Sequence, residues 1–349
     1  MSTNDDLLER INPVRLRLEA ARRLGCEVVP LDPETGRLNE IRLGPKQRVL
    51  VGGLSPLNDA VAARLVGDKH FTGLALASHG YRTPRTVRCL QPGYFRDEDY
   101  SSHTGIRPAV ELAHEVGFPL VVKPNGGSRG IDIAVVEDAA SLESAVEQVW
   151  RRNYLALAQQ PVPGFDLRID FLDGEFLFGY TRQPVRVVGD GRRPLRELFA
   201  DLDPRMRGEG FETHLSNDPI WQRQTTERPE LSLDSVLAQG EALGFETPIL
   251  NLNRLCVGQR LETLSQPWTD FGLAIGRVLS LRHFGIDLKI ESMDQDPAEA
   301  VVIEVNSSPS LVHMARIGHL DAALEAERKI VTAILDHESY LERLGAPSR

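Results

Sequence analysis

The spacing of apolar residues predicts a small α/β unit in the first 80 residues. Apolar positions at near-helical spacing run through 10–24, and helical patterns return over 55–65 and 68–77. Between the first two, short apolar runs separated by turn residues predict strands within 28–51. We expect residues 1–80 to fold together.

Residues 81–162 follow a strand–strand–helix–strand pattern. FPLVVK (118–123) and IDIAVVE (131–137) read as strands joined by a glycine-rich turn, and YLALAQQ (154–160) reads as a third. DAASLESAVEQVWRRN has apolar residues on one helical face, and we expect Ser141 to be its N-cap. The pattern predicts a compact second unit.

Residues 163–349 are richer in strands. LRIDFLDGEFLFGYTR reads as a hairpin around Asp173-Gly174, and two later strands, 285–290 and 301–305, are joined by the turn DQDP. Two helices are also expected, over 271–282 and 320–337.

A polar, arginine-rich connection is expected over 186–232. Its arginines are either a solvated charge run or a basic collar for an acidic substrate, and both interpretations stay open; they are Arg186, Arg192, Arg193, Arg196, Arg205 and Arg207.

Composition narrows the choice of partners. With 349 residues and a formal charge of −10, the chain lacks the cationic surface that nucleic acids and anionic membranes require. No apolar run approaches the roughly 20 residues of a membrane helix, and the polar start MSTNDDLLER lacks a signal-peptide core. Three cysteines without CxxC spacing fit a reducing compartment. We therefore expect a cytoplasmic protein without nucleic-acid or membrane partners.

Polar residues interrupt two apolar strands near the end of the chain. In VVIEVNSSPSL, Glu304 and Asn306 are two residues apart and therefore face the same way on a strand. Asp287 in GIDLKI would join them if the two strands pair. Two carboxylates and an amide oxygen are hard ligands suited to Mg²⁺. The alternative is a pair of surface strands with solvated acids.

A second candidate site follows the strand 118–123. Lys123 is the last residue of this strand and the first of the segment KPNGGSRG. The three glycines of the segment let the backbone approach an anion closely. This is not a Walker loop, because no GK[ST] follows. Read alone, a glycine-rich turn between two strands is most often only a hairpin turn.

Several of these segments occur in the order found in ATP-grasp ligases. Lys123 with its glycine loop, AQQPVPGFDLR, RQPVRVVGDGRRPLREL, GIDL and IEVNSSPSL together resemble that superfamily over about residues 55–318. The PVRVVGDG and LREL segments are similar to the ATP-grasp part of cyanophycin synthetase, and the VNSSP turn to RimK-type glutamate ligases. The resemblance implies an α/β (α+β) ATP-grasp fold with three subdomains, 1–80, 81–162 and 163–349, and a nucleotide held between two antiparallel sheets.

The resemblance also implies roles for particular residues. Nucleotide contacts are implied for Lys69, Lys123, Gly126, Gly127, Ser128, Gly130, Gln159, Gln160, Val162 and Asp166. Metal ligation is implied for Asp287, Glu304 and Asn306, and contact with transferred phosphate or substrate for Arg168, Arg182 and Arg254. Each of these assignments has a purely structural alternative. Lys69 could be a solvated helix residue, and Gln159-Gln160 an exposed strand end. Arg168 and Arg182 could lie on a solvated face of a sheet.

The implied activity is ATP-dependent ligation of a carboxylate and an amine through an acyl phosphate, with Mg²⁺ or Mn²⁺ as metal. The substrates would be amino acids or short peptides, and relatives suggest a homodimer. Two departures, GGSRGID in the loop and Asn253–Gln259 where cyanophycin synthetase has ANLSTGG, leave the acid and the amine unidentified. The alternatives are a small-molecule kinase, a non-catalytic Mg-ATP-binding module, and an enzyme modifying the end of a peptide or protein.

Overall fold

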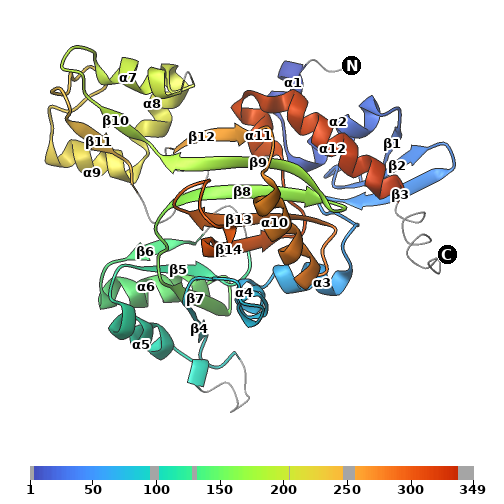
Figure 1. Cartoon of the computed structure of the whole chain (residues 1–349), viewed down its shortest axis with the longest axis horizontal. Helices are drawn as coiled ribbons and strands as arrows, with labels where there is room; N and C mark the ends of the chain where they lie inside the picture. The colour runs from blue at the N-terminus through green and yellow to red at the C-terminus, as the bar shows by residue number, and fades with distance from the viewer. Residues whose placement is uncertain (1–3, 95–101, 128–131, 204, 247–255, 337–349) are drawn as a thin grey trace.

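Two antiparallel sheets meet in the middle of the molecule, and two further units are attached to the larger sheet (Figure 1). The computed structural model describes residues 4–94, 102–127, 132–203, 205–246 and 256–336. Across these ranges, no helix has the length and apolar composition needed to cross a bilayer.

The large sheet carries charged side chains on one face. Its five antiparallel strands follow the order β12 (Cys256–Leu261), β9 (Glu175–Pro184), β8 (Phe165–Leu172), β13 (His283–Ile290) and β14 (Val301–Asn306). Leu167 and Phe171 of β8 point into the apolar core. Since side chains alternate along a strand, Asp166, Arg168 and Asp170 share the opposite face.

Three helices cover the apolar face of the large sheet. They are α3 (Ala60–Val66), α4 (Lys69–Ser78) and α10 (Gln266–Val278), which begins five residues earlier than the pattern predicted. Two glycines let α10 lie close to the sheet. A Cβ on Gly272 would meet the ring of Phe171 at 2.3 Å, and one on Gly276 would meet Phe284 at the same distance. The two rings are themselves stacked.

Helices pack against one face of the small sheet. Its strands follow the order β4 (Thr86–Leu90), β7 (Leu155–Gln159), β5 (Leu120–Pro124) and β6 (Ala134–Val136), with α5 (Arg107–Val116) and α6 (Ala139–Trp150) packed against it. The predicted N-cap Ser141 is wrong. Asp138 caps α6, and Ser141 completes a capping box as its third residue.

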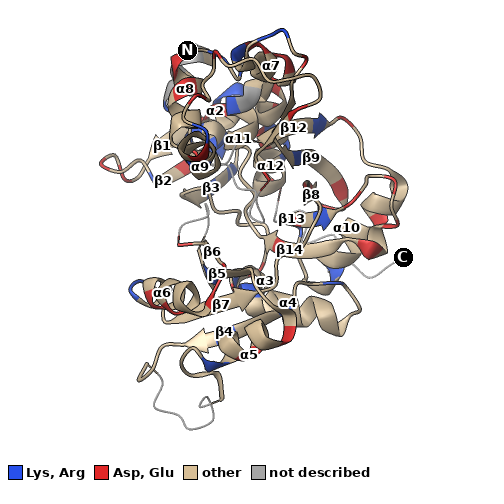
Figure 2. Cartoon of the chain, turned by 90° about the vertical axis from the view of Figure 1, so that its left-hand side faces the viewer, with Lys and Arg blue, Asp and Glu red and all other residues tan. Residues whose placement is uncertain are grey.

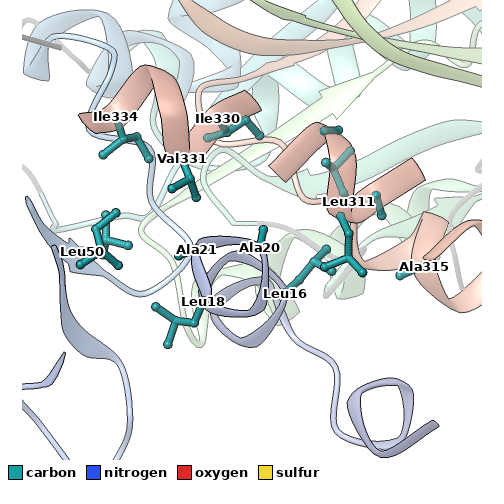
Figure 3. Packing of buried hydrophobic residues seen from close by; sticks show 14 of the residues in the cluster. Leu16, Leu18, Ala20, Ala21, Leu50, Leu311, Ala315, Ile330, Val331 and Ile334 are labelled. Carbon is teal, nitrogen blue, oxygen red and sulfur yellow. The ribbon is translucent and has the colours of Figure 1, made fainter. Parts of the chain in front are cut away.

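The N-terminal unit is completed by the last described helix. The three-stranded sheet of β1 (Glu27–Pro30), β2 (Leu38–Leu43) and β3 (Lys46–Val51) and the helices α1 (Asn4–Glu9) and α2 (Pro13–Arg23) share one core with α12 (Leu320–Leu335). Figure 3 shows Ala20 and Ala21 of α2 below Val331 of α12, and Leu16 beside Leu311. The segment between β14 and α12 forms the short helix α11 (Val312–Met314) and the π-helical turn Ala315–His319.

The predicted polar connection over 186–232 is wrong, because this segment has its own hydrophobic core. An inserted unit between β9 and β12 contains β10 (Arg186–Val188), α7 (Leu195–Leu202), α8 (Gly208–Ser216), α9 (Pro219–Glu227) and β11 (Ala242–Gly244). Phe199, Phe211, Trp221 and Phe245 pack together inside it. Its arginines lie outside this core and most pair with neighbouring acids.

Candidate functional site

Asp287, Glu304 and Asn306 lie together where β13 pairs with β14. Asp287 is the direct cross-strand neighbour of Glu304, and Asn306 follows two residues later on β14. The Asn306 amide donates a hydrogen bond to Asp287 Oδ2 over 3.1 Å. Two carboxylates directly opposite each other repel, so this arrangement requires cations nearby.

Arg168 supplies one of these cations from the neighbouring strand β8. Its Nη1 lies 2.5 Å from Asp287 Oδ2, and its Nε lies 2.5 Å from Asp170 Oδ1. Burial alone would lower the pKa of Arg168, but the two carboxylates raise it above its ordinary value. Gly285 makes room for this bridge, since a Cβ there would lie 2.2 Å from Asp170 and 2.3 Å from Arg168. Sequence reasoning missed Asp170 and Gly285.

Asp166 lies within a second ionic group on the same face. Lys289 Nζ is 2.8 Å from Asp166 Oδ1, and Arg182 Nη2 is 3.1 Å from Asp166 Oδ2 and 4.0 Å from Asp287. Burial raises the pKa of Asp166, against the opposing effect of the two cations. Asp166 is therefore already paired on the sheet, and its predicted contact with the nucleotide would add to these bonds. Lys289 was not predicted.

Lys69 extends from the start of α4 toward the paired acids. Its Nζ lies 3.3 Å from Glu304 Oε1 and donates to the carbonyl of Gly127 over 2.8 Å. The side chain is only 10 % exposed, so the alternative of a solvated helix residue does not hold.

Lys123 is buried at the end of β5, with a neutral partner. Its Nζ donates to Gln159 Oε1 over 2.9 Å, and the Gln159 amide in turn donates to Thr86. Burial lowers the pKa of Lys123 to about 8, although the carboxylate of Glu304 opposes this. A buried ammonium group without a bonded anion is costly, and a phosphate group would supply the missing charge.

The remaining predicted contacts divide into described and undescribed residues. Gly126 and Gly127 form the start of the turn after β5, and Gly127 has a φ of 108°, which favours glycine. Gln159 is a buried strand residue, Gln160 is exposed with its N–H bonded to Arg85, and Val162 is half-buried. Ser128, Gly130 and Arg254 lie outside the described residues.

A cleft between the two sheets brings the two lysines together with Glu304. It has a volume of about 380 Å³ and is lined by α4, β4, β5, β7 and β14, with Lys69, Lys123, Gln159 and Glu304 in its wall. In both views the small sheet lies beside α4 and β14 (Figures 1 and 2). Two ammonium groups beside Glu304, with Asp287 on the next strand, can hold an anion together with a divalent cation.

The donor set fits Mg²⁺ better than a transition metal. Over the described ranges, no group of three or more histidine, cysteine or acidic side chains is arranged to hold a metal ion. Asp287, Glu304 and Asn306 offer only oxygen ligands, and they are too few to fill an octahedron. Mg²⁺ held in this way takes its remaining ligands from phosphate oxygens and water. The adjacent lysines would hold such phosphates within the same cleft.

Comparison with curated proteins finds relatives of low identity over most of the chain. It is 25 % identical over 290 residues to cyanophycin synthetase of Trichormus variabilis, covering 80 % of this chain and 30 % of that protein. It is 24 % identical over 276 residues to the glutathione biosynthesis bifunctional protein GshAB of Mannheimia succiniciproducens, covering 75 % and 34 %. The chain thus spans about a third of these relatives. No family model matches.

Solved structures agree on the fold. A bifunctional glutathione synthetase from Pasteurella multocida aligns with a TM-score of 0.57 and 19 % identity, over 95 % of this chain and 44 % of that one. A D-alanine–D-alanine ligase from Bacillus anthracis complexed with ATP aligns with a TM-score of 0.50 and 14 % identity, over 83 % and 72 %. The expected α/β fold class and the resemblance drawn from the motifs are confirmed.

Proposed function

Because the chain has the ATP-grasp fold, we propose that it is an ATP-dependent carboxylate–amine ligase. One observation carries the proposal: Lys69 and Lys123 enter the same cleft as Glu304 of β14, whose cross-strand neighbour on β13 is Asp287. The cleft therefore provides cations for the phosphate groups of ATP and oxygen ligands for Mg²⁺. Relatives named for glutathione and D-alanyl-D-alanine support an amino acid or a short peptide as substrate.

The proposed reaction has two steps. A carboxylate oxygen of the first substrate attacks the γ-phosphorus of ATP, the bond to ADP breaks, and an acyl phosphate forms. An amine then attacks the acyl carbon, phosphate leaves, and the amine nitrogen loses a proton. The products are an amide, ADP and phosphate.

This chain's residues act by positioning and by charge. Lys69 and Lys123 would stabilise the negative charge that spreads over the phosphoryl group during transfer. Asp287, Glu304 and Asn306 would hold Mg²⁺, which when bound neutralises phosphate charge. Arg168, held between two carboxylates, would orient Asp287. No nucleophilic serine or cysteine is required.

The nucleotide affinity should depend on pH through Lys123. Its pKa is about 8 in the free protein, and a neighbouring phosphate would raise it, so binding takes up a proton above that pH. Affinity for the analogue adenylyl imidodiphosphate is therefore expected to fall as pH rises beyond 8, by at most about tenfold per unit. Calorimetric titrations at pH 7 to 9.5 measure it.

The matched variant is Lys123→Ala. It should bind the analogue roughly 30- to 100-fold more weakly at pH 7, because a charge-assisted hydrogen bond is lost, and its affinity should lose the decline above pH 8. Undiminished affinity in this variant would remove Lys123 from the phosphate site.

A screen of ADP release tests the proposed activity. Amino acids and dipeptides are paired as acid and amine with Mg-ATP, and the products are identified by mass spectrometry. ADP release that requires both partners and yields an amide is the expected result. Release with a hydroxyl compound alone would identify a kinase instead. Binding of Mg-ATP without turnover of any pair would identify a binding module.

A further inference from the structure

The turn that follows β5 is tied to the first residues of α4 by Asn125. The side-chain oxygen of Asn125 accepts a hydrogen bond from the backbone N–H of His70 over 3.0 Å. Its backbone carbonyl accepts a second from the N–H of Lys69 over 3.3 Å, and its own N–H donates to Leu155 at the start of β7. Asn125 is buried. It therefore joins the small sheet directly to a helix of the large sheet.

This junction is not needed to cap α4. The helix already has an N-cap, since the carboxylate of Asp68 accepts from the N–H of Phe71. Asn125 accepts hydrogen bonds from two further backbone N–H groups at the start of α4, those of Lys69 and His70, which have no partner within the helix. The partner comes from a different sheet, so the hydrogen bonds fix the relative position of two elements.

Both elements joined by Asn125 carry residues of the proposed nucleotide site. Lys123 lies two residues before Asn125. Lys69 donates its backbone N–H to the carbonyl of Asn125. α4 packs against β14, which carries Glu304. A continuous series of short contacts thus runs from the strand with the buried lysine to the strand with the proposed metal ligand.

We propose that Asn125 is a positioning residue that holds Lys69 and Lys123 at the spacing required for the phosphate groups of the nucleotide. The inference rests on the proposed function. The proposed role also explains why position 125 carries asparagine and not aspartate. Aspartate would accept the same hydrogen bond and would favour the helix N-terminus, but its charge would lie beside the bound phosphates. A neutral acceptor avoids this repulsion.

The test compares three variants of the full chain. Asn125→Ala removes the acceptor, and Asn125→Asp keeps it while adding charge. Asn153→Ala is the matched control, because Asn153 also accepts one backbone hydrogen bond, from Leu155, within the same unit. Asn125→Gln, which moves the amide by one methylene group, replaces the alanine variant if that variant does not fold. Calorimetry measures binding of Mg-adenylyl imidodiphosphate, and hydrogen exchange measures the His70 amide without ligand.

Asn125→Ala should bind the analogue about tenfold more weakly, as expected for one lost hydrogen bond and a looser site. Its His70 amide should exchange faster, and its KM for ATP should rise more than its kcat falls. Asn125→Asp should restore slow exchange without restoring affinity, whereas Asn153→Ala should keep wild-type affinity.

Wild-type affinity in Asn125→Ala, with or without faster exchange, would overturn the inference and leave the ligase proposal standing. Failure of the wild-type chain to bind the analogue would instead overturn the proposed function. An equal loss of affinity in Asn153→Ala would reduce the role of Asn125 to general stability and overturn the inference as well.

Discussion

Replacing Glu304 by glutamine is expected to abolish ADP formation while leaving the melting temperature near that of the wild type. The amide keeps the shape of the side chain, but it removes the charge that faces Lys69 and the oxygen proposed to bind Mg²⁺. Loss of a metal's charge stabilisation is worth several kcal/mol, so turnover should fall roughly a thousandfold or more. A coupled assay of ADP release with the pair identified by the substrate screen measures it.

Glu299→Gln is the control for this change. Glu299 lies just before β14 and pairs with Arg82, but its side chain is 64 % exposed and outside the cleft. This variant should keep wild-type turnover. Unchanged turnover in Glu304→Gln would refute the metal role of the β13–β14 face.

Replacing Glu327 by glutamine should destabilise the fold by about 3–5 kcal/mol. Arg17 of α2 and Glu327 of α12 form an ion pair at 2.9 Å, with side chains only 2 % and 1 % exposed. Arg17 also donates to the carbonyls of Gly53 and Leu54. Removal of the carboxylate would leave a buried guanidinium group without its counterion. Urea unfolding followed by circular dichroism measures the loss.

The same helix offers a control two residues away. Glu325 pairs with Arg328, but both side chains are about half exposed, and exposed pairs contribute at most about 1 kcal/mol. Glu325→Gln should therefore unfold almost as the wild type does. Equal, small losses in both variants would show that the buried pair contributes no more than an exposed one.

Local patterns in the sequence were sufficient for the elements whose residues are close together along the chain. The hairpin around Asp173-Gly174 is confirmed, and both residues have the positive φ that a tight two-residue turn requires. Period-two alternation put Glu304 and Asn306 on one face of β14, and the pairing of β14 with the preceding strand β13 brought Asp287 alongside. These predictions needed no knowledge of distant contacts.

The missed residues depend on pairing between distant strands. Asp170 and Gly285 are cross-strand neighbours only because β8 pairs with β13, more than 100 residues later. Lys289 meets Asp166 through the same register. Asn125 becomes informative only once α4 lies beside it. No spacing in the sequence indicates these pairs.

The inserted unit was missed for a different reason. Its large apolar residues are separated by charged ones, so the segment reads as polar although Phe199, Phe211 and Trp221 meet in a core.

The order of strands in the large sheet has a consequence for synthesis on the ribosome. β8 lies in the middle of the finished sheet, yet its partner β13 is made more than 100 residues later. Until β13 has been made, a nascent chain exposes an unpaired edge of β8. In the same way, the apolar face of α2 stays uncovered until α12 has been made. Such late-closing contacts slow folding and invite aggregation. We therefore expect the growing polypeptide to be most prone to aggregation between the emergence of β8 and that of α12.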